Sequence, residues 1–100
     1  MADARDVDSD VIADFCRRWR ITEFSLFGSV LTDRFGPASD VDVLVSLGEN
    51  TPLSLYDWVD MIDELNRIFG RPVDLVEKSG LRNPFRRHEI LTNRRVIYAG

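Results

Sequence analysis

The sequence has one cysteine, no long apolar run and no excess of basic residues. The single Cys16 cannot form an internal disulfide, and its position between Phe15 and Trp19 predicts a buried thiol in a reducing cytoplasm. A membrane-spanning helix needs roughly 20 apolar residues, so we expect no membrane association. Seventeen acidic residues against 13 basic ones, a net charge of −4, disfavour direct binding to a nucleic acid backbone.

The length and the hydrophobic content suffice for one core. With 100 residues, 44% of them hydrophobic, we expect a single domain over residues 1–100. The acidic stretch 1–10 lacks the basic and apolar regions of a leader peptide, so we expect the mature protein to be the whole chain.

Hydrophobic periodicity and turn residues predict the elements. Helices are expected over 9–19, 30–35, 52–69 and 84–92, and strands over 21–27, 40–45, 73–76 and 96–98. Thr51 with Pro52 is predicted to begin the third helix, and Gly70 to end it. Helices that alternate with strands predict an α/β (α+β) fold, in which helices flank one small mixed sheet.

Two aspartates interrupt an apolar strand. Asp40 and Asp42 stand two residues apart beside Val41, Val43 and Val45, so both side chains would leave the same face of a strand, with Cα atoms about 6.5 Å apart. Aspartate is depleted in strands, and a divalent cation shared by both carboxylates would offset their repulsion. The alternative is an exposed strand face on which Asp40 caps a turn.

Gly28 and Ser29 end the strand that precedes this pair. A strand that turns into a helix at Gly-Ser presents backbone N–H groups and a hydroxyl to an anion, which indicates a phosphate site. An ordinary turn with a serine cap is the alternative. The combination of a phosphate cradle with two carboxylates about a dozen residues later favours binding of a metal and a nucleotide.

Gly28-Ser29 followed by Ser39-Asp40-Val41-Asp42-Val43-Leu44-Val45 resembles the signature of the DNA polymerase β-like nucleotidyltransferase superfamily. The short chain is similar to the minimal nucleotidyltransferases that are paired with HEPN proteins in toxin–antitoxin operons. The resemblance implies a nucleotidyltransferase fold in which Gly28 and Ser29 bind the nucleotide. Two departures are Thr32, where many members carry an arginine, and Ala38, where many carry an acid.

The resemblance also assigns roles to three carboxylates. It implies that Asp40 and Asp42 hold two magnesium or manganese ions, and that Asp74 helps to bind the catalytic ion and to activate the attacking hydroxyl. On its own, Asp74 between Val73 and Leu75 is typical of a solvated strand residue. The three aspartates are therefore the predicted catalytic and metal-binding residues.

The function implied is transfer of AMP from ATP to a hydroxyl, a tyrosine of a partner HEPN toxin, by a protein adenylyltransferase that serves as the antitoxin. One alternative is an inactive antitoxin that acts by binding and occlusion. Others are transfer to a small molecule and transfer to RNA ends, the latter disfavoured by the acidic charge. Five arginines make the last quarter basic, and we expect most on solvated helix faces and one or two against the triphosphate or an acidic partner: Arg82, Arg86, Arg87, Arg94 and Arg95.

Overall fold

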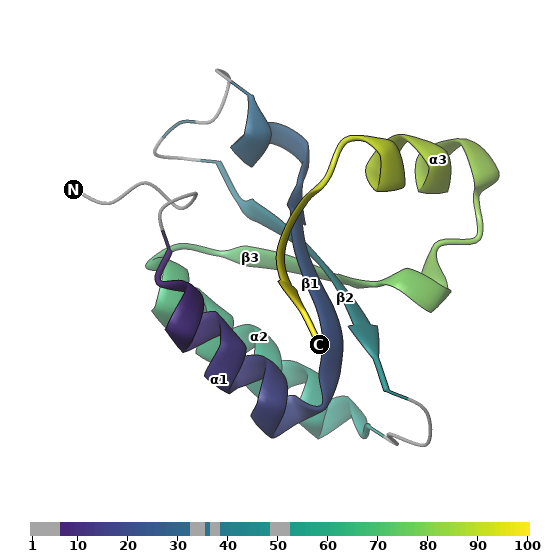
Figure 1. Cartoon of the computed structure of the whole chain (residues 1–100). Coiled ribbons are helices and arrows are strands. Elements are labelled where there is room, and N and C mark those ends of the chain that lie inside the picture. The colour runs from purple at the N-terminus through teal and green to yellow at the C-terminus, as the bar shows by residue number, and fades with distance from the viewer. Residues whose placement is uncertain (1–6, 33–35, 37–38, 49–52) are drawn as a thin grey trace.

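The computed structural model describes residues 7–32, 36, 39–48 and 53–100, and four strands within them form one mixed sheet (Figure 1). In chain order the elements are α1 (Ser9–Trp19), β1 (Ile21–Phe27), the 3-10 helix η2 (Gly28–Leu31), β2 (Val41–Leu47), α2 (Leu55–Phe69), β3 (Val73–Glu77), the 3-10 helix η3 (Lys78–Gly80), α3 (Pro84–Thr92) and β4 (Arg95–Ala99). The predicted small mixed sheet flanked by helices is confirmed.

The strand order β3-β2-β1-β4 combines two kinds of pairing. β1 runs antiparallel to both β2 and β4, whereas β2 and β3 are parallel. A parallel pair needs a long crossover, and α2 supplies it between the two strands. This crossover brings residues about 30 positions apart in the chain into register.

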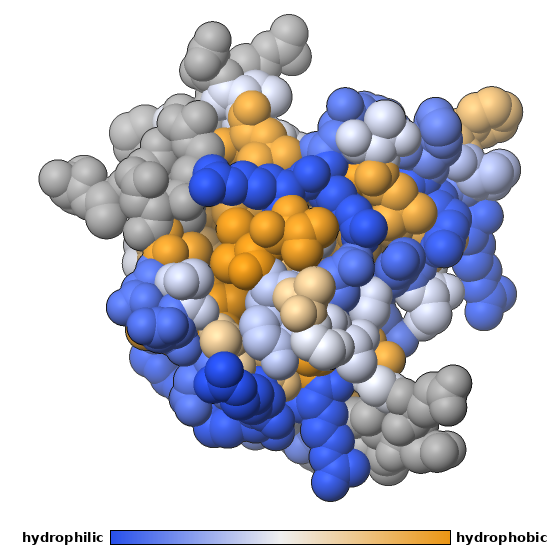
Figure 2. All heavy atoms as spheres, viewed as in Figure 1, coloured by the Kyte–Doolittle hydropathy of each residue, from blue (hydrophilic) through white to orange (hydrophobic). Residues whose placement is uncertain are grey.

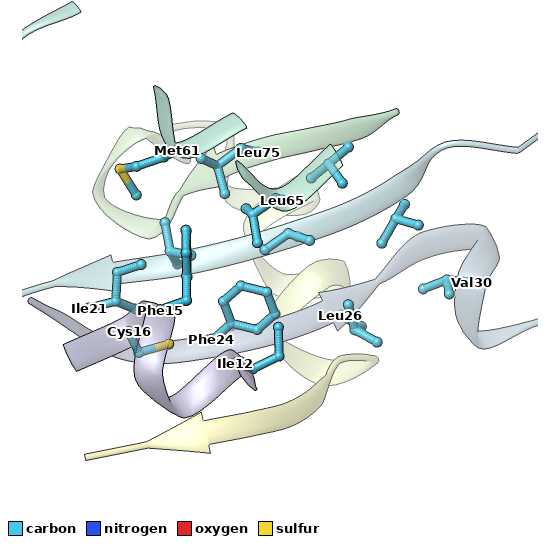
Figure 3. Packing of buried hydrophobic residues seen from close by; sticks show 14 residues of the cluster. Ile12, Phe15, Cys16, Ile21, Phe24, Leu26, Val30, Met61, Leu65 and Leu75 are labelled. Atoms are coloured by element: carbon cyan, nitrogen blue, oxygen red, sulfur yellow. The ribbon is translucent and has the colours of Figure 1, made fainter. Parts of the chain in front are cut away.

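The main core lies between α1, α2 and one face of the sheet (Figure 3). Phe24 on β1 is fully buried and meets Phe15 of α1 edge to face, with ring centroids 6.2 Å apart. The alternating valines predicted for β2 are all fully buried here: Val41, Val43 and Val45. Because side chains alternate along a strand, the residues between these valines must lie on the opposite face.

A smaller apolar cluster covers part of that opposite face. Phe27 and Leu44 of the sheet pack there with Leu81 and with Ile90 of α3. Asn83 caps α3 by accepting hydrogen bonds from the N–H groups of Phe85 (3.0 Å) and Arg86 (3.2 Å). The cluster therefore holds α3 against the sheet face that the other two helices leave uncovered.

Cys16 is buried as the sequence predicts, and both tryptophans pack beside the same core. Cys16 is fully buried, and burial raises the pKa of its thiol to about 12. Trp19 packs against the core and donates from Nε1 to Glu64 at 3.1 Å, and Trp58 packs against the same core. No helix among the described residues is long and apolar enough to span a membrane.

The main differences from the predicted boundaries lie at the start of α2 and on both sides of the loop before β2. The start of α2 at Thr51 and Pro52 is wrong, because the helix begins at Leu55: the Ser54 hydroxyl accepts from Asp57 N–H at 3.1 Å, and the Asp57 carboxylate accepts from Ser54 N–H at 3.0 Å. Thr51 and Pro52 themselves lie outside the described residues.

The other two differences flank the loop before β2. In place of the predicted helix over 30–35, one 3-10 turn covers Gly28–Leu31, and residues 33–35 lie outside the described part. Asp40 directly precedes β2 instead of belonging to it, since the strand begins at Val41.

Figure 2 shows hydrophilic side chains over much of the surface in this view, with apolar atoms exposed near its centre, where β4 crosses. β4 is an edge strand, and its Val96 is 46% exposed. Apolar atoms contribute more than half of the accessible surface of folded proteins, so their exposure beside an edge strand is ordinary.

We expect Phe24→Ala to lower the free energy of unfolding by about 3–5 kcal/mol, because the lost ring leaves a cavity in the main core. Phe85→Ala is the matched control: Phe85 is 85% exposed, and its truncation should change stability by less than about 0.5 kcal/mol. Denaturant unfolding followed by circular dichroism measures both. Equal losses would contradict the position of the core.

Candidate functional site

Two of the predicted carboxylates lie side by side. The parallel register pairs Asp42 of β2 with Asp74 of β3. Neighbouring strands are about 4.8 Å apart, and paired residues of parallel strands point to the same face. Because Val41 and Val73 face the main core, both carboxylates lie on the opposite face of the sheet, the one that carries α3.

Like charges and burial act together on Asp42. Asp42 is half-buried, and burial, then the charge of Asp74, then that of Asp40, raise the pKa of its carboxyl above the ordinary value of 3.8. The Arg86 guanidinium acts in the opposite direction. Asp40 is exposed and directly precedes β2. Although it stands outside the strand, its charge contributes to the raised pKa of Asp42.

Gly28 lies against the Asp42 carboxylate. Its φ of +75° is in the left-handed region, which residues with a Cβ rarely adopt. A Cβ built on Gly28 would overlap Oδ2 of Asp42 and lie 3.2 Å from its Cγ. The absence of a Cβ at Gly28 therefore lets the Asp42 carboxylate lie directly against the backbone at the end of β1.

An open pocket of about 940 Å³ extends from this glycine. Its walls come from the end of β1, from η2 and the residue after it, and from α3: Phe27, Gly28, Ser29, Leu31, Thr32, Arg86, Glu89, Ile90 and Asn93. None of the three aspartates is among these lining residues; Asp42 adjoins the pocket through Gly28, which lies against its carboxylate. Predicted ligand residues Gly28 and Ser29 thus lie between a roomy pocket and the carboxylates.

Arg86 is one of the five arginines that the sequence offers for the triphosphate or an acidic partner, and it lines the pocket. It stands on the pocket side of α3 with Glu89, Ile90 and Asn93, at helical spacings of three, four and seven. The helix over 84–92 was predicted, but without the fold nothing distinguished Arg86 from its neighbours. Arg87 does something different, because its Nη1 donates to the backbone carbonyl of Lys78 at 3.1 Å.

The donor chemistry fits a hard divalent cation. Magnesium prefers carboxylate oxygens and usually keeps several waters and substrate phosphates as its other ligands. The side-by-side Asp42 and Asp74, with Asp40 nearby, offer such oxygens and carry a repulsion that a cation would relieve. Within the described residues no three histidine, cysteine or carboxylate side chains converge as a metal site. Metal binding by Asp40, Asp42 and Asp74 stays a prediction.

The chain matches the family described as the nucleotidyltransferase domain over residues 9–97. It is 31% identical over 68 residues to a Methanocaldococcus jannaschii protein named as a candidate protein adenylyltransferase, covering 68% of each chain. It is 36% identical over 66 residues to the protein adenylyltransferase MntA of Thermococcus cleftensis, covering 66% of this chain and 65% of that protein.

Solved structures share the fold. A chain of a toxin–antitoxin crystal structure with AMP-PNP superposes with a TM-score of 0.74 at 18% identity, covering 94% of this chain and 75% of that one. A chain from tri-AMPylated Shewanella oneidensis HEPN toxin in complex with MNT antitoxin gives a TM-score of 0.62 at 19% identity, covering 92% and 70%.

We expect Asp42→Asn to raise the thermal stability of the metal-free chain at neutral pH, because it removes a carboxylate that repels Asp74 and Asp40. The raised pKa of Asp42 means that the folded chain binds this proton more tightly than the unfolded chain. Ionisation therefore costs stability as the pH rises from 3.8 through the folded-state pKa, and the gain in the variant should be full above that window and vanish below it.

The matched control is Asp60→Asn, an exposed carboxylate on α2, across the sheet from the site. Melting curves recorded by circular dichroism from mildly acidic to neutral pH in a chelator compare the two variants. A pH-dependent gain of the same size in Asp60→Asn would contradict a specific repulsion at Asp42.

Proposed function

We propose that this chain, which belongs to the nucleotidyltransferase domain family, transfers AMP from ATP to a hydroxyl of a HEPN-type toxin and so acts as the antitoxin of a toxin–antitoxin pair. The observation that carries the proposal is the pairing of Asp42 with Asp74 on adjacent parallel strands, directly beside Gly28 and a pocket of about 940 Å³. This is an arrangement of carboxylates and bare backbone that suits a metal-bound triphosphate.

The carboxylates would hold magnesium or manganese. We propose that Asp42, Asp40 and Asp74 bind two such ions, which when bound neutralise charge on the attacking and leaving oxygens. Gly28 would let its own backbone approach the phosphates closely, and the Ser29 hydroxyl would donate to a phosphate oxygen.

The transfer forms one bond and breaks one. The acceptor hydroxyl oxygen attacks the α-phosphorus in line, the bond from that phosphorus to the bridging oxygen breaks, and pyrophosphate leaves with the bond electrons. Asp74 is exposed at the sheet edge, where an incoming group can reach it, and we assign it to draw off the hydroxyl proton. We assign Asp42 to hold the metal-bound nucleotide in position.

The acceptor has to come from outside the chain. The described residues supply one sheet, its covering helices and a pocket open to solvent, and no further layer covers Asp40 and Asp74. The names of the relatives support a protein acceptor, and the AMPylated HEPN toxin found with an antitoxin of this fold supports its class.

An occluding antitoxin is the main alternative. Such a protein would keep the fold and the partner interface but would transfer nothing. Thr32, a neutral residue on the pocket wall where many relatives of the motif carry an arginine, is the feature that favours it.

Gly28→Ala should weaken binding of MgATP by about 10-fold or more, because the new Cβ would overlap Oδ2 of Asp42 and displace this carboxylate. Gly70→Ala is the matched control: Gly70 also has a positive φ, of 69°, but nothing lies within 4 Å of its added Cβ. Both variants should lose about 1–2 kcal/mol of stability, and only the first should lose nucleotide. Calorimetric titration with MgATP measures the affinity of each variant. If the two variants bind MgATP with equal affinity, the phosphates lie elsewhere.

Incubation of the chain with a HEPN-family partner protein and MgATP should add AMP to that partner. Asp40→Asn combined with Asp42→Asn should still form the complex, because neither side chain belongs to the core, yet leave the partner unmodified. Intact-protein mass spectrometry measures the modification, and co-elution measures the complex. Should the double variant silence the toxin in cells as fully as the parent, occlusion and not transfer is the mechanism.

A further inference from the structure

Arg86 is the only cation among the described residues that line the large pocket. The backbone of the residue is fixed by α3, whose first turn is capped by Asn83 through the N–H of Arg86 itself, at 3.2 Å. The helix in turn is anchored on the sheet by Ile90, which is buried against Phe27 and Leu44. A flexible side chain thus extends from a rigid base into the pocket.

The guanidinium is not used to hold the fold together. Within the described residues it makes no hydrogen bond or ion pair, and the side chain is exposed. Arg18 and Arg87 differ: Arg18 forms ion pairs with Asp14 and Glu64, and Arg87 binds the Lys78 carbonyl. An arginine positioned in a pocket without an internal partner is available to a ligand of opposite charge.

The charge distribution of the pocket tells which part of a ligand meets Arg86. Arg86 lines the same pocket as Gly28 and Ser29, and Gly28 lies against the Asp42 carboxylate. Glu89 and Asn93 line the same side of α3 one and two turns further on. A polyphosphate would be repelled at Glu89 and attracted at Arg86.

Given the proposed use of ATP, we propose that the Arg86 guanidinium binds the β- and γ-phosphates of the nucleotide, with the nucleoside toward Glu89 and Asn93. Its planar set of donors pairs with two phosphate oxygens at once. It supplies positive charge that neutral Thr32, which lines the same pocket, does not provide. The pyrophosphate released by transfer keeps both of these phosphates, so Arg86 also stabilises the leaving group.

The test compares Arg86→Ala with Arg82→Ala by calorimetric titration of the isolated chain with MgATP and with AMP. Arg82 is exposed just ahead of α3 and does not line the pocket, so its loss should change either affinity by less than about 2-fold. Arg86→Ala should weaken MgATP by about 10- to 100-fold and AMP much less, because AMP lacks the β- and γ-phosphates. Arg86→Lys should restore part of the affinity as a point charge.

Unchanged MgATP affinity in Arg86→Ala, or an equal loss for MgATP and AMP, would overturn this role while leaving AMP transfer by the parent chain standing. A parent chain that binds no MgATP would overturn the proposed function and the role of Arg86 together. Melting curves of Arg86→Ala that match the parent show that any loss of affinity arises in the pocket and not from unfolding.

Discussion

The parallel pairing of β2 with β3 is the constraint on which the arrangement of the candidate site depends. It sets Val41 opposite Val73 and Val43 opposite Leu75, and these four side chains enter the main core. Since side chains alternate along each strand, burying them commits Asp42 and Asp74 to the other face at the same level. A shift of one residue in either strand would turn a carboxylate into the core, at a prohibitive desolvation cost. Hydrophobic burial on one face therefore enforces electrostatic repulsion on the other.

The two faces of the sheet have different roles: one carries the main core, and the other carries the candidate site. α1 and α2 cover one face with the large, fully buried core, while α3 covers only part of the second face through a small cluster around Phe27 and Leu44. That partial cover leaves the pocket beside Gly28 open. In this arrangement, the stability of the domain comes mainly from the face that packs against α1 and α2. The other face can therefore carry the repulsion between its carboxylates without loss of the fold.

Local patterns in the sequence were enough to predict most elements and the fold class. β1 and α1 follow the predicted ranges, because alternation and helical spacing report burial directly. The start of α2 was missed since Thr51-Pro52 and Ser54 both read as helix starts, and only Ser54 has the reciprocal partner Asp57 three residues on. The reciprocal capping box therefore distinguishes the two candidate helix starts.

Some of the candidate site residues could likewise be predicted from local sequence, and others could not. Asp40, Asp42 and Gly28 could be found from spacing and from resemblance, because they fall in one short stretch of the chain. The register that places Asp74 beside Asp42 is a product of the α2 crossover, and no local pattern encodes it. The position of Arg86 depends on how α3 packs on the second sheet face, against β2, which lies some 45 residues earlier in the chain. Local sequence therefore does not show that Arg86 lines the pocket, and the three-dimensional structure does.

The buried Cys16 gives the domain a natural reporter of its own opening. It is the sole thiol of the chain, fully enclosed in the main core, and its pKa of about 12 leaves almost no reactive thiolate at neutral pH. A thiol reagent can therefore modify the folded chain only during the brief moments when α1 separates from the sheet. The labelling rate therefore measures how often these openings occur. It can be measured without any substitution in the chain, with ligand or partner bound or absent.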